Sequence, residues 1–172
     1  MKIPVRLIEF LNQNQVRYEI VHHPVAFTAQ ELAAIEGVKG HEHAKVVMAK
    51  TDLQLLMLVV PADHRVDWQR FGELIGGHAG LAAEADFAAL FPDCEIGTMP
   101  PFGMLYNVVL WVDCRLTLSP RFVFEAGTHS DAIKMDSADY VRLANGQVAD
   151  FARKLQSTNA SVMQSITPKE SS

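Results

Sequence analysis

The stretch AKVVMAKTDLQLLMLVVP, residues 44–61, decides the fold. Two apolar runs flank a short polar segment, which is typical of two strands joined by a turn near residues 51–52. In the first strand the pleat places Lys45, Val47 and Ala49 on the same face. Lys45 therefore either extends along the strand edge to reach water or points its ammonium group into a cavity.

Helical and strand patterns surround this hairpin. The expected helices are residues 4–15, 28–36, 67–76, 84–91 and 137–145, with 147–156 extending or following the last one; the expected strands are 17–23, 107–113, 121–127 and 131–136. Helices alternate with strands early in the chain, and the later strands follow one another with short turns. This order predicts an α/β protein of the α+β type, with a mixed, largely antiparallel sheet or partial barrel surrounded by helices.

The chain length of 172 residues suits a single domain. We expect this domain to span residues 1–156, and residues 157–172 to form a flexible tail, because the last segment is polar and lacks periodicity. No apolar run approaches the roughly 20 residues that span a bilayer. Two cysteines without C-x-x-C spacing suit a reducing compartment. We therefore expect a cytoplasmic protein without a membrane partner.

The segment EIGTMPPFGM, residues 95–104, contains two consecutive prolines between glycines. Such a segment cannot be a helix or a central strand. Stiff loops on a rigid scaffold often line functional sites. The alternative is a purely structural corner.

The segment EAGTHSD, residues 125–131, ends a predicted strand with a glycine turn. Gly127 permits a tight turn and exposes backbone N–H groups. Thr128 and His129 follow it, and the imidazole can donate to a ligand or act as an acid or base. The alternative is a solvated histidine in a polar loop.

Other chemistry has less support in the sequence. His22, His23, His41 and His43 lack a carboxylate or cysteine at the usual metal-ligand spacing, so we expect no metal and no cofactor. The common hydrolase, nucleotide-binding and zinc-protease motifs are absent. Cys94 is either a nucleophile or an inert buried thiol.

Three segments, taken in order, resemble the YbaK-like aminoacyl-tRNA deacylases, relatives of the editing domain of bacterial prolyl-tRNA synthetases. The first is HHPVAFTAQELA followed by AKVVMAK, the second is GTMPPFG, and the third is VDCRL together with FEAGTHSDAIKM. The second segment fits the family's G-x-x-x-P loop, with Gly97 and Pro101 in the two fixed places. The similarity covers about residues 16–152.

The resemblance implies hydrolysis of the ester that joins a wrong amino acid to the 3′-terminal adenosine of a tRNA. Lys45 matches the family's functional lysine, and Gly97 and Pro101 match the loop that walls the aminoacyl pocket. Gly127 matches the family's glycine turn, and His129 falls where some branches carry a histidine near the substrate.

The implied substrate is a small amino acid such as alanine, serine, threonine or cysteine. Val46 stands where some alanine-specific members carry an asparagine, which argues against alanine. Phe27, Val47 and Met99 are expected either to wall the pocket or to belong to the core, and Thr128 is expected beside the substrate.

The implied partner is the 3′ end of a mischarged tRNA. A net charge of −5 argues against broad nucleic-acid binding but permits a local basic patch. The candidate cations are Lys39, Lys45, Lys50, Arg65, Arg70, Arg115 and Arg121, which otherwise are scattered surface charges. Weak tRNA affinity aided by a synthetase or an elongation factor would reconcile charge and function. Two other hypotheses remain: a non-catalytic binding or sensor module, and a metal-dependent hydrolase.

Overall fold

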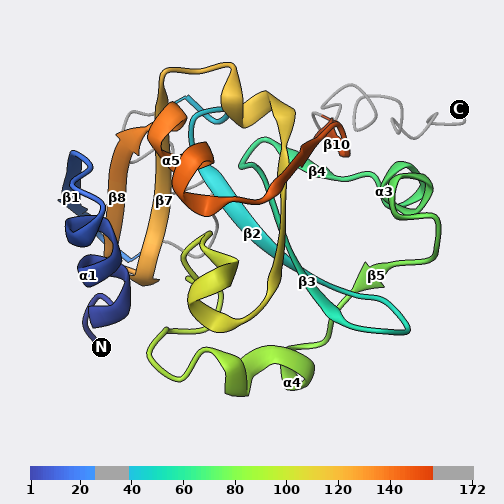
Figure 1. Ribbon diagram of the computed structural model, residues 1–172, viewed down its shortest axis with the longest axis horizontal. Coiled ribbons are helices and arrows are strands. Elements are labelled where there is room, and N and C mark those ends of the chain that lie inside the picture. Colours follow the sequence, from blue (N-terminus) through green and yellow to red (C-terminus); the bar gives the residue numbers. More distant parts are fainter. Residues whose placement is uncertain (26–38, 157–172) are drawn as a thin grey trace, which may run out of the picture.

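The computed structural model describes residues 1–25 and 39–156 (Figure 1). The expected helix over 28–36, Phe27 and the expected tail over 157–172 lie outside the described residues. No helix within the described ranges is long and apolar enough to cross a membrane.

The hairpin forms as the sequence predicts. Strand β2 (Ala44–Lys50) pairs antiparallel with β3 (Leu55–Pro61). The Thr51 amide donates to the Gln54 carbonyl at 3.0 Å, which closes the turn. Alternate β2 residues enter two different hydrophobic cores, so both faces of this strand are covered over most of its length.

The strands form two main sheets and one short ladder. A five-stranded sheet has the order β5-β2-β3-β6-β9, in which β3–β6 and β6–β9 are parallel and the other pairs antiparallel. A three-stranded antiparallel sheet has the order β1-β8-β7, and β10 pairs with β4. The remaining bounds are β1 Tyr18–His22, β4 His64–Val66, β5 Gly80–Leu81, β6 Val109–Asp113, β7 Arg121–Thr128, β8 Asp131–Asp136, β9 Gln147–Ala149 and β10 Ala152–Lys154. The prediction of a mixed sheet with helices around it is confirmed, and the described strands do not close into a barrel.

The helices follow the predicted positions. They are α1 (Val5–Gln13), α3 (Trp68–Ile75), α4 (Glu84–Phe87) and α5 (Ser137–Ala144), with 3₁₀ turns at Ala88–Leu90, Gly103–Tyr106 and Cys114–Thr117. Asp67 caps α3 by accepting from the Arg70 amide, and Gly76 ends it with a φ of 65°. Asp136 occupies the N-cap position of α5. Ser137 is the first helical residue, and its hydroxyl donates to the Ser119 carbonyl.

The expected helix over 147–156 is wrong. Asn145 takes a left-handed φ of 49° and ends α5. The chain then turns into β9, which pairs with β6, and β10, which pairs with β4. The amides of Phe151 and Ala152 donate to one carboxylate oxygen of Asp113, at 3.0 and 2.9 Å, which is incompatible with their use in a helix.

Two cores stabilise the domain. The main core gathers α1, α5 and the facing sides of both sheets, with Phe102, Phe122, Phe124 and Tyr140 in mutual ring contact. The second core lies under α3, on the other face of the five-stranded sheet, around Phe71 and Phe151. In Figure 1, α1 and α3 lie at opposite sides of the molecule.

Candidate active site

Lys45 lies on β2, on the face turned away from the main core. Its neighbours in the strand, Ala44 and Met48, are buried in that core, whereas Val47 packs toward the second core. The lysine side chain is half-buried. Burial lowers the pKa of its ammonium group, and the nearby Asp63 charge opposes this effect. Lys45 is therefore a partly desolvated cation, not a fully solvated surface lysine.

The proline-rich loop and the glycine turn are hydrogen-bonded to each other. The Glu95 amide donates to the Gly127 carbonyl, and the Gly127 amide donates to the Thr98 carbonyl, both at 2.9 Å. The His129 amide donates to the Glu95 carboxylate at 2.7 Å. Three hydrogen bonds between residues far apart in sequence thus join the two loops into one unit.

Both loops depend on a glycine in the left-handed region. Gly97 has a φ of 83° and Gly127 a φ of 85°. The amide of Gly127 is already used, so this glycine supports the loop and does not offer that hydrogen to a ligand. Among the described residues, the amides of Gly97 and Met99 have no hydrogen-bond acceptor. Gly97 is also exposed, so its N–H is available to a substrate.

A single parallel bridge relates Lys45 to the glycine turn. His43 on the approach to β2 pairs with Val123 of β7, and the Val123 amide donates to the Glu42 carbonyl at 3.0 Å. Both strands leave this bridge in the same direction, one toward Lys45 and the other toward Gly127. Within the described ranges, no hydrogen bond or ion pair joins Lys45 to the loop over 97–101.

The side chains beside the glycine turn have different surroundings. The Thr128 hydroxyl is buried, donates to Asp131 at 2.6 Å and accepts from the Ser130 amide, so it holds the turn together. The His129 side chain is half-buried next to it. His22, in contrast, is largely exposed and pairs with Asp131 from outside the turn.

The expected pocket walls lie in or beside the cores. Pro101 is buried, and its carbonyl accepts from the Tyr140 hydroxyl at 2.8 Å. Met99 is buried in the main core beside a cavity of about 30 Å³. Val47 is half-buried against the second core. Phe27 lies outside the described residues.

Comparison with known proteins decides the family. The model of the aminoacyl-tRNA editing domain matches residues 23–143, which include Lys45, the 97–101 loop and the 127–129 turn. This chain belongs to the aminoacyl-tRNA editing domain family. The resemblance noted in the sequence is confirmed, and with it the expectation of an editing enzyme of the deacylase class.

Individual relatives agree with this assignment. The editing domain is 28% identical over 156 residues to the multifunctional Ser/Thr-tRNA deacylase ProXp-y of Escherichia coli K12, covering 86% of this chain and 92% of that protein. A structure provisionally assigned as a trans-editing enzyme for prolyl tRNA synthetase matches with a TM-score of 0.76 and 22% identity, covering 86% of this chain and 95% of that one. The crystal structure of hypothetical protein APE2540 matches with a TM-score of 0.78 and 22% identity, covering 86% of this chain and 99% of that one. The two structures share the fold.

The nucleophile hypothesis for Cys94 is disfavoured in this editing domain. Cys94 is buried, and its Sγ lies 3.3 Å from the Tyr106 hydroxyl. Burial raises the pKa of the thiol to about 11. Only the thiolate is strongly nucleophilic, so Cys94 is an unreactive thiol near neutral pH.

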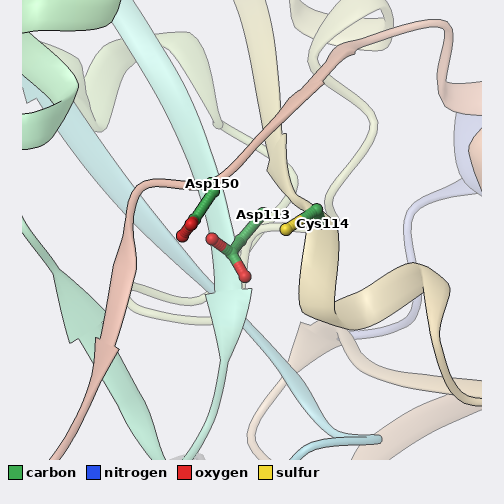
Figure 2. Close-up of side chains that lie close together, drawn as sticks. All are labelled: Asp113, Cys114 and Asp150. Atoms are coloured by element: carbon green, nitrogen blue, oxygen red, sulfur yellow. The ribbon is translucent and has the colours of Figure 1, made fainter.

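One group with metal-ligand chemistry occurs within the described ranges: Asp113, Cys114 and Asp150 (Figure 2). Figure 2 shows the two carboxylates close together, with the Cys114 sulfur beside them. The Asp113 carboxylate, however, accepts from the Arg115 guanidinium at 3.1 Å and from three backbone amides. Asp150 accepts from Arg115 at 2.8 Å. Arg115 and Arg70, which pairs with Asp150 at 3.0 Å, together already balance the two carboxylate charges, which fits a structural role.

Sequence reasoning missed Glu95 and Asp113. Glu95 joins the two loops of the candidate site, and Asp113 anchors the chain between β9 and β10. Glu95 stands just before the G-x-x-x-P loop. That position indicates a bridging role only once the turn that contacts the loop is known. For Asp113, a carboxylate at the end of an apolar strand was the available signal.

Gly127→Ala should destabilise the editing domain more than Gly97→Ala. An alanine at either position would have to adopt a left-handed backbone conformation, which costs about 1–2 kcal/mol. At Gly127 the added carbon would also lie 2.7 Å from Pro4 Cγ, whereas nothing lies within 4 Å at Gly97. We expect a loss of about 2–4 kcal/mol in the free energy of unfolding for Gly127→Ala. Urea denaturation of both variants measures the difference, and equal losses would contradict the predicted steric contribution.

Proposed function

We propose that this editing domain acts in trans as a deacylase that removes serine or threonine from mischarged tRNA. The support is the family match, together with the relative whose name states a Ser/Thr-tRNA deacylase. The observation that carries the proposal is the set of hydrogen bonds that joins the 95–98 loop to the 127–129 turn. From the parallel bridge between His43 and Val123, β2 runs toward Lys45 in the same direction as β7 runs toward this turn.

The proposed reaction needs no protein nucleophile, because an aminoacyl ester is already activated. Water attacks the ester carbonyl, and a free hydroxyl of the terminal ribose orients or deprotonates that water. The Gly97 N–H donates to the developing oxyanion or to a ribose hydroxyl. Lys45 supplies positive charge to the oxyanion or to the neighbouring phosphate. His129 lies close enough to the glycine turn to contact the adenosine or the amino acid.

Selectivity in this proposal comes from the size of the pocket. Serine and threonine differ by one methyl group, and a hydrophobic pocket separates such substrates by only about 1–3 kcal/mol. One site can therefore accept both. Phe27, Val47, Met99 and Pro101 are the proposed walls, with Thr128 holding the turn beside them. We further propose that residues 1–156 form the deacylase domain, that the protein works in the cytoplasm, and that a synthetase or elongation factor delivers the tRNA.

A panel of misacylated tRNAs tests this function. We expect multiple turnovers on seryl- and threonyl-tRNA, slower hydrolysis of alanyl-tRNA, and the same rates after exhaustive treatment with EDTA. Release of the amino acid is followed with radiolabelled ester at enzyme concentrations far below substrate. Stoichiometric binding without release would instead support a sensor module, and loss of activity in EDTA would support a metal-dependent hydrolase.

A further inference from the structure

Two arginines face each other across the short β4–β10 ladder. Arg65 and Arg153 are direct partners in the antiparallel register, and both are exposed. Like charges directly opposite each other on neighbouring strands destabilise the pair. The fold therefore keeps an unfavourable arrangement here, which an anion bound between the two guanidinium groups would relieve.

Carboxylates near this pair are already engaged. Asp63 accepts from His64 at 2.8 Å, and Asp67 caps α3 through the Arg70 amide. Asp150 pairs with two other arginines, Arg70 and Arg115. Across residues 1–25 and 39–156, neither Arg65 nor Arg153 has an ion-pair partner.

Three of the other candidate cations, in contrast, have carboxylate partners. Lys50 pairs with Asp86 at 3.2 Å, and Arg70 and Arg115 pair with Asp150 at 3.0 and 2.8 Å. Carboxylates therefore partly offset the positive charge of these three residues. Arg65 is one of the described candidate cations without an ion-pair partner, and Arg153 of β10 lies opposite it.

The two arginines line a groove of about 240 Å³. Its other lining residues are Val47, Val66, Trp68 and Leu81. Val47 is two residues beyond Lys45 in β2, so the groove and Lys45 share one face of that strand. Trp68 is half-buried at the start of α3 and provides an aromatic surface in the same groove.

We propose that this groove binds the phosphodiester backbone of the single-stranded 3′ end of tRNA, next to the terminal adenosine. The inference rests on the proposed function. Guanidinium groups donate paired hydrogen bonds to phosphate oxygens. A neighbouring base stacks on Trp68, which any base can do because each has a π-face. Such a local site explains how a chain of net charge −5 contacts an RNA end.

The test variant is Arg65→Gln/Arg153→Gln in the full chain. Binding of uncharged tRNA is measured by fluorescence anisotropy over a range of salt concentrations. We expect the Kd to rise about tenfold at low salt. The slope of the logarithm of the association constant against the logarithm of the salt concentration should become about 1.4 less negative, the value for two phosphate contacts to a single strand. The matched control is Arg17→Gln/Arg142→Gln, which removes the same charge from two exposed residues, one just before β1 and one in α5, that do not line the groove; it should keep the parental slope.

Stability and a short substrate separate this inference from its alternatives. The test variant should melt at the same temperature as the parent or higher, because the like-charge repulsion is removed. Hydrolysis of a seryl ester of adenosine, which has no upstream phosphate, should be unchanged. An inactive parent would refute the proposed function, whereas the binding measurement would still decide the groove.

Three results would overturn the inference. The first is an unchanged Kd and salt slope for uncharged tRNA in the test variant. The second is an equal effect in the control variant. The third is a Kd of the parent for uncharged tRNA that does not change with salt concentration, which would exclude phosphate contacts in the groove.

Discussion

Lys45→Met should lower kcat/KM on misacylated tRNA by about 10²- to 10³-fold, the usual cost of one oxyanion-stabilising contact. Methionine removes the charge and keeps most of the side-chain length. Lys45→Arg is the control, because it keeps the charge near Asp63 and should retain more activity. Parental turnover by Lys45→Met would remove this residue from the mechanism.

Stability distinguishes a functional Lys45 from a structural one. Burial lowers the pKa of Lys45, so the fold disfavours its charged form, and the charge of Asp63 only partly offsets this. Asp63 keeps His64 as a partner when the lysine is lost. We therefore expect Lys45→Met to unfold at the same urea concentration as the parent or higher. A large loss of stability would indicate a structural lysine.

The pH dependence of stability provides a second check. Between the lowered pKa of Lys45 and the unfolded value of 10.5, the unfolded chain binds more protons than the folded one. The free energy of unfolding contributed by this group therefore rises with pH through that interval. The rise should be absent in Lys45→Met, which a series of urea titrations at alkaline pH measures.

Asp113→Ala should destabilise the protein by about 3–5 kcal/mol, the usual cost of removing one partner from a buried charge network. Asp113 is fully buried. Its loss would leave the amides of Phe151 and Ala152 without an acceptor and would weaken the placement of Arg115. Urea denaturation measures the loss.

Two controls bracket this effect. Asp113→Asn keeps one acceptor oxygen and should lose less stability than the alanine variant. Asp150→Ala removes a half-exposed carboxylate and should cost only about 0–1 kcal/mol. Where the variants remain folded, deacylation rates should match the parent. A variant that stays fully stable but loses activity would show that the cluster serves the chemistry.

Local patterns made much of the fold predictable. The β2–β3 hairpin, α1 and α3 each follow from residues close in sequence: alternating apolar runs, a periodic apolar face, and an aspartate cap with a terminal glycine. The segment over 147–156 failed because Val148, Phe151, Ala152 and Leu155 have helical spacing. Its true structure depends on an acceptor 38 residues away, at Asp113, which local periodicity does not reveal.

The sequence was enough to single out residues of the candidate site, but not to predict which residues of the two loops are hydrogen-bonded to each other. Gly97 and Gly127 could be singled out because turns favour glycine, and both do adopt positive φ. The bonds that unite their loops involve Glu95 and Thr98, whose partners lie about thirty residues further on. Family resemblance supplied the lysine's role, which no spacing in this chain alone could give. Proximity of Lys45 to the loop stays a prediction.

The contact between Pro4 and the Gly127 turn makes these two positions mutually dependent in evolution. A side chain at 127 would collide with the proline ring, so what is tolerated there depends on what occupies position 4. Pro4→Gly should recover the steric part of the defect in Gly127→Ala, but not the backbone part, which stems from the φ of 85°. Substitutions at these two positions should therefore show epistasis, which links the residue before α1 to the glycine turn of the candidate site.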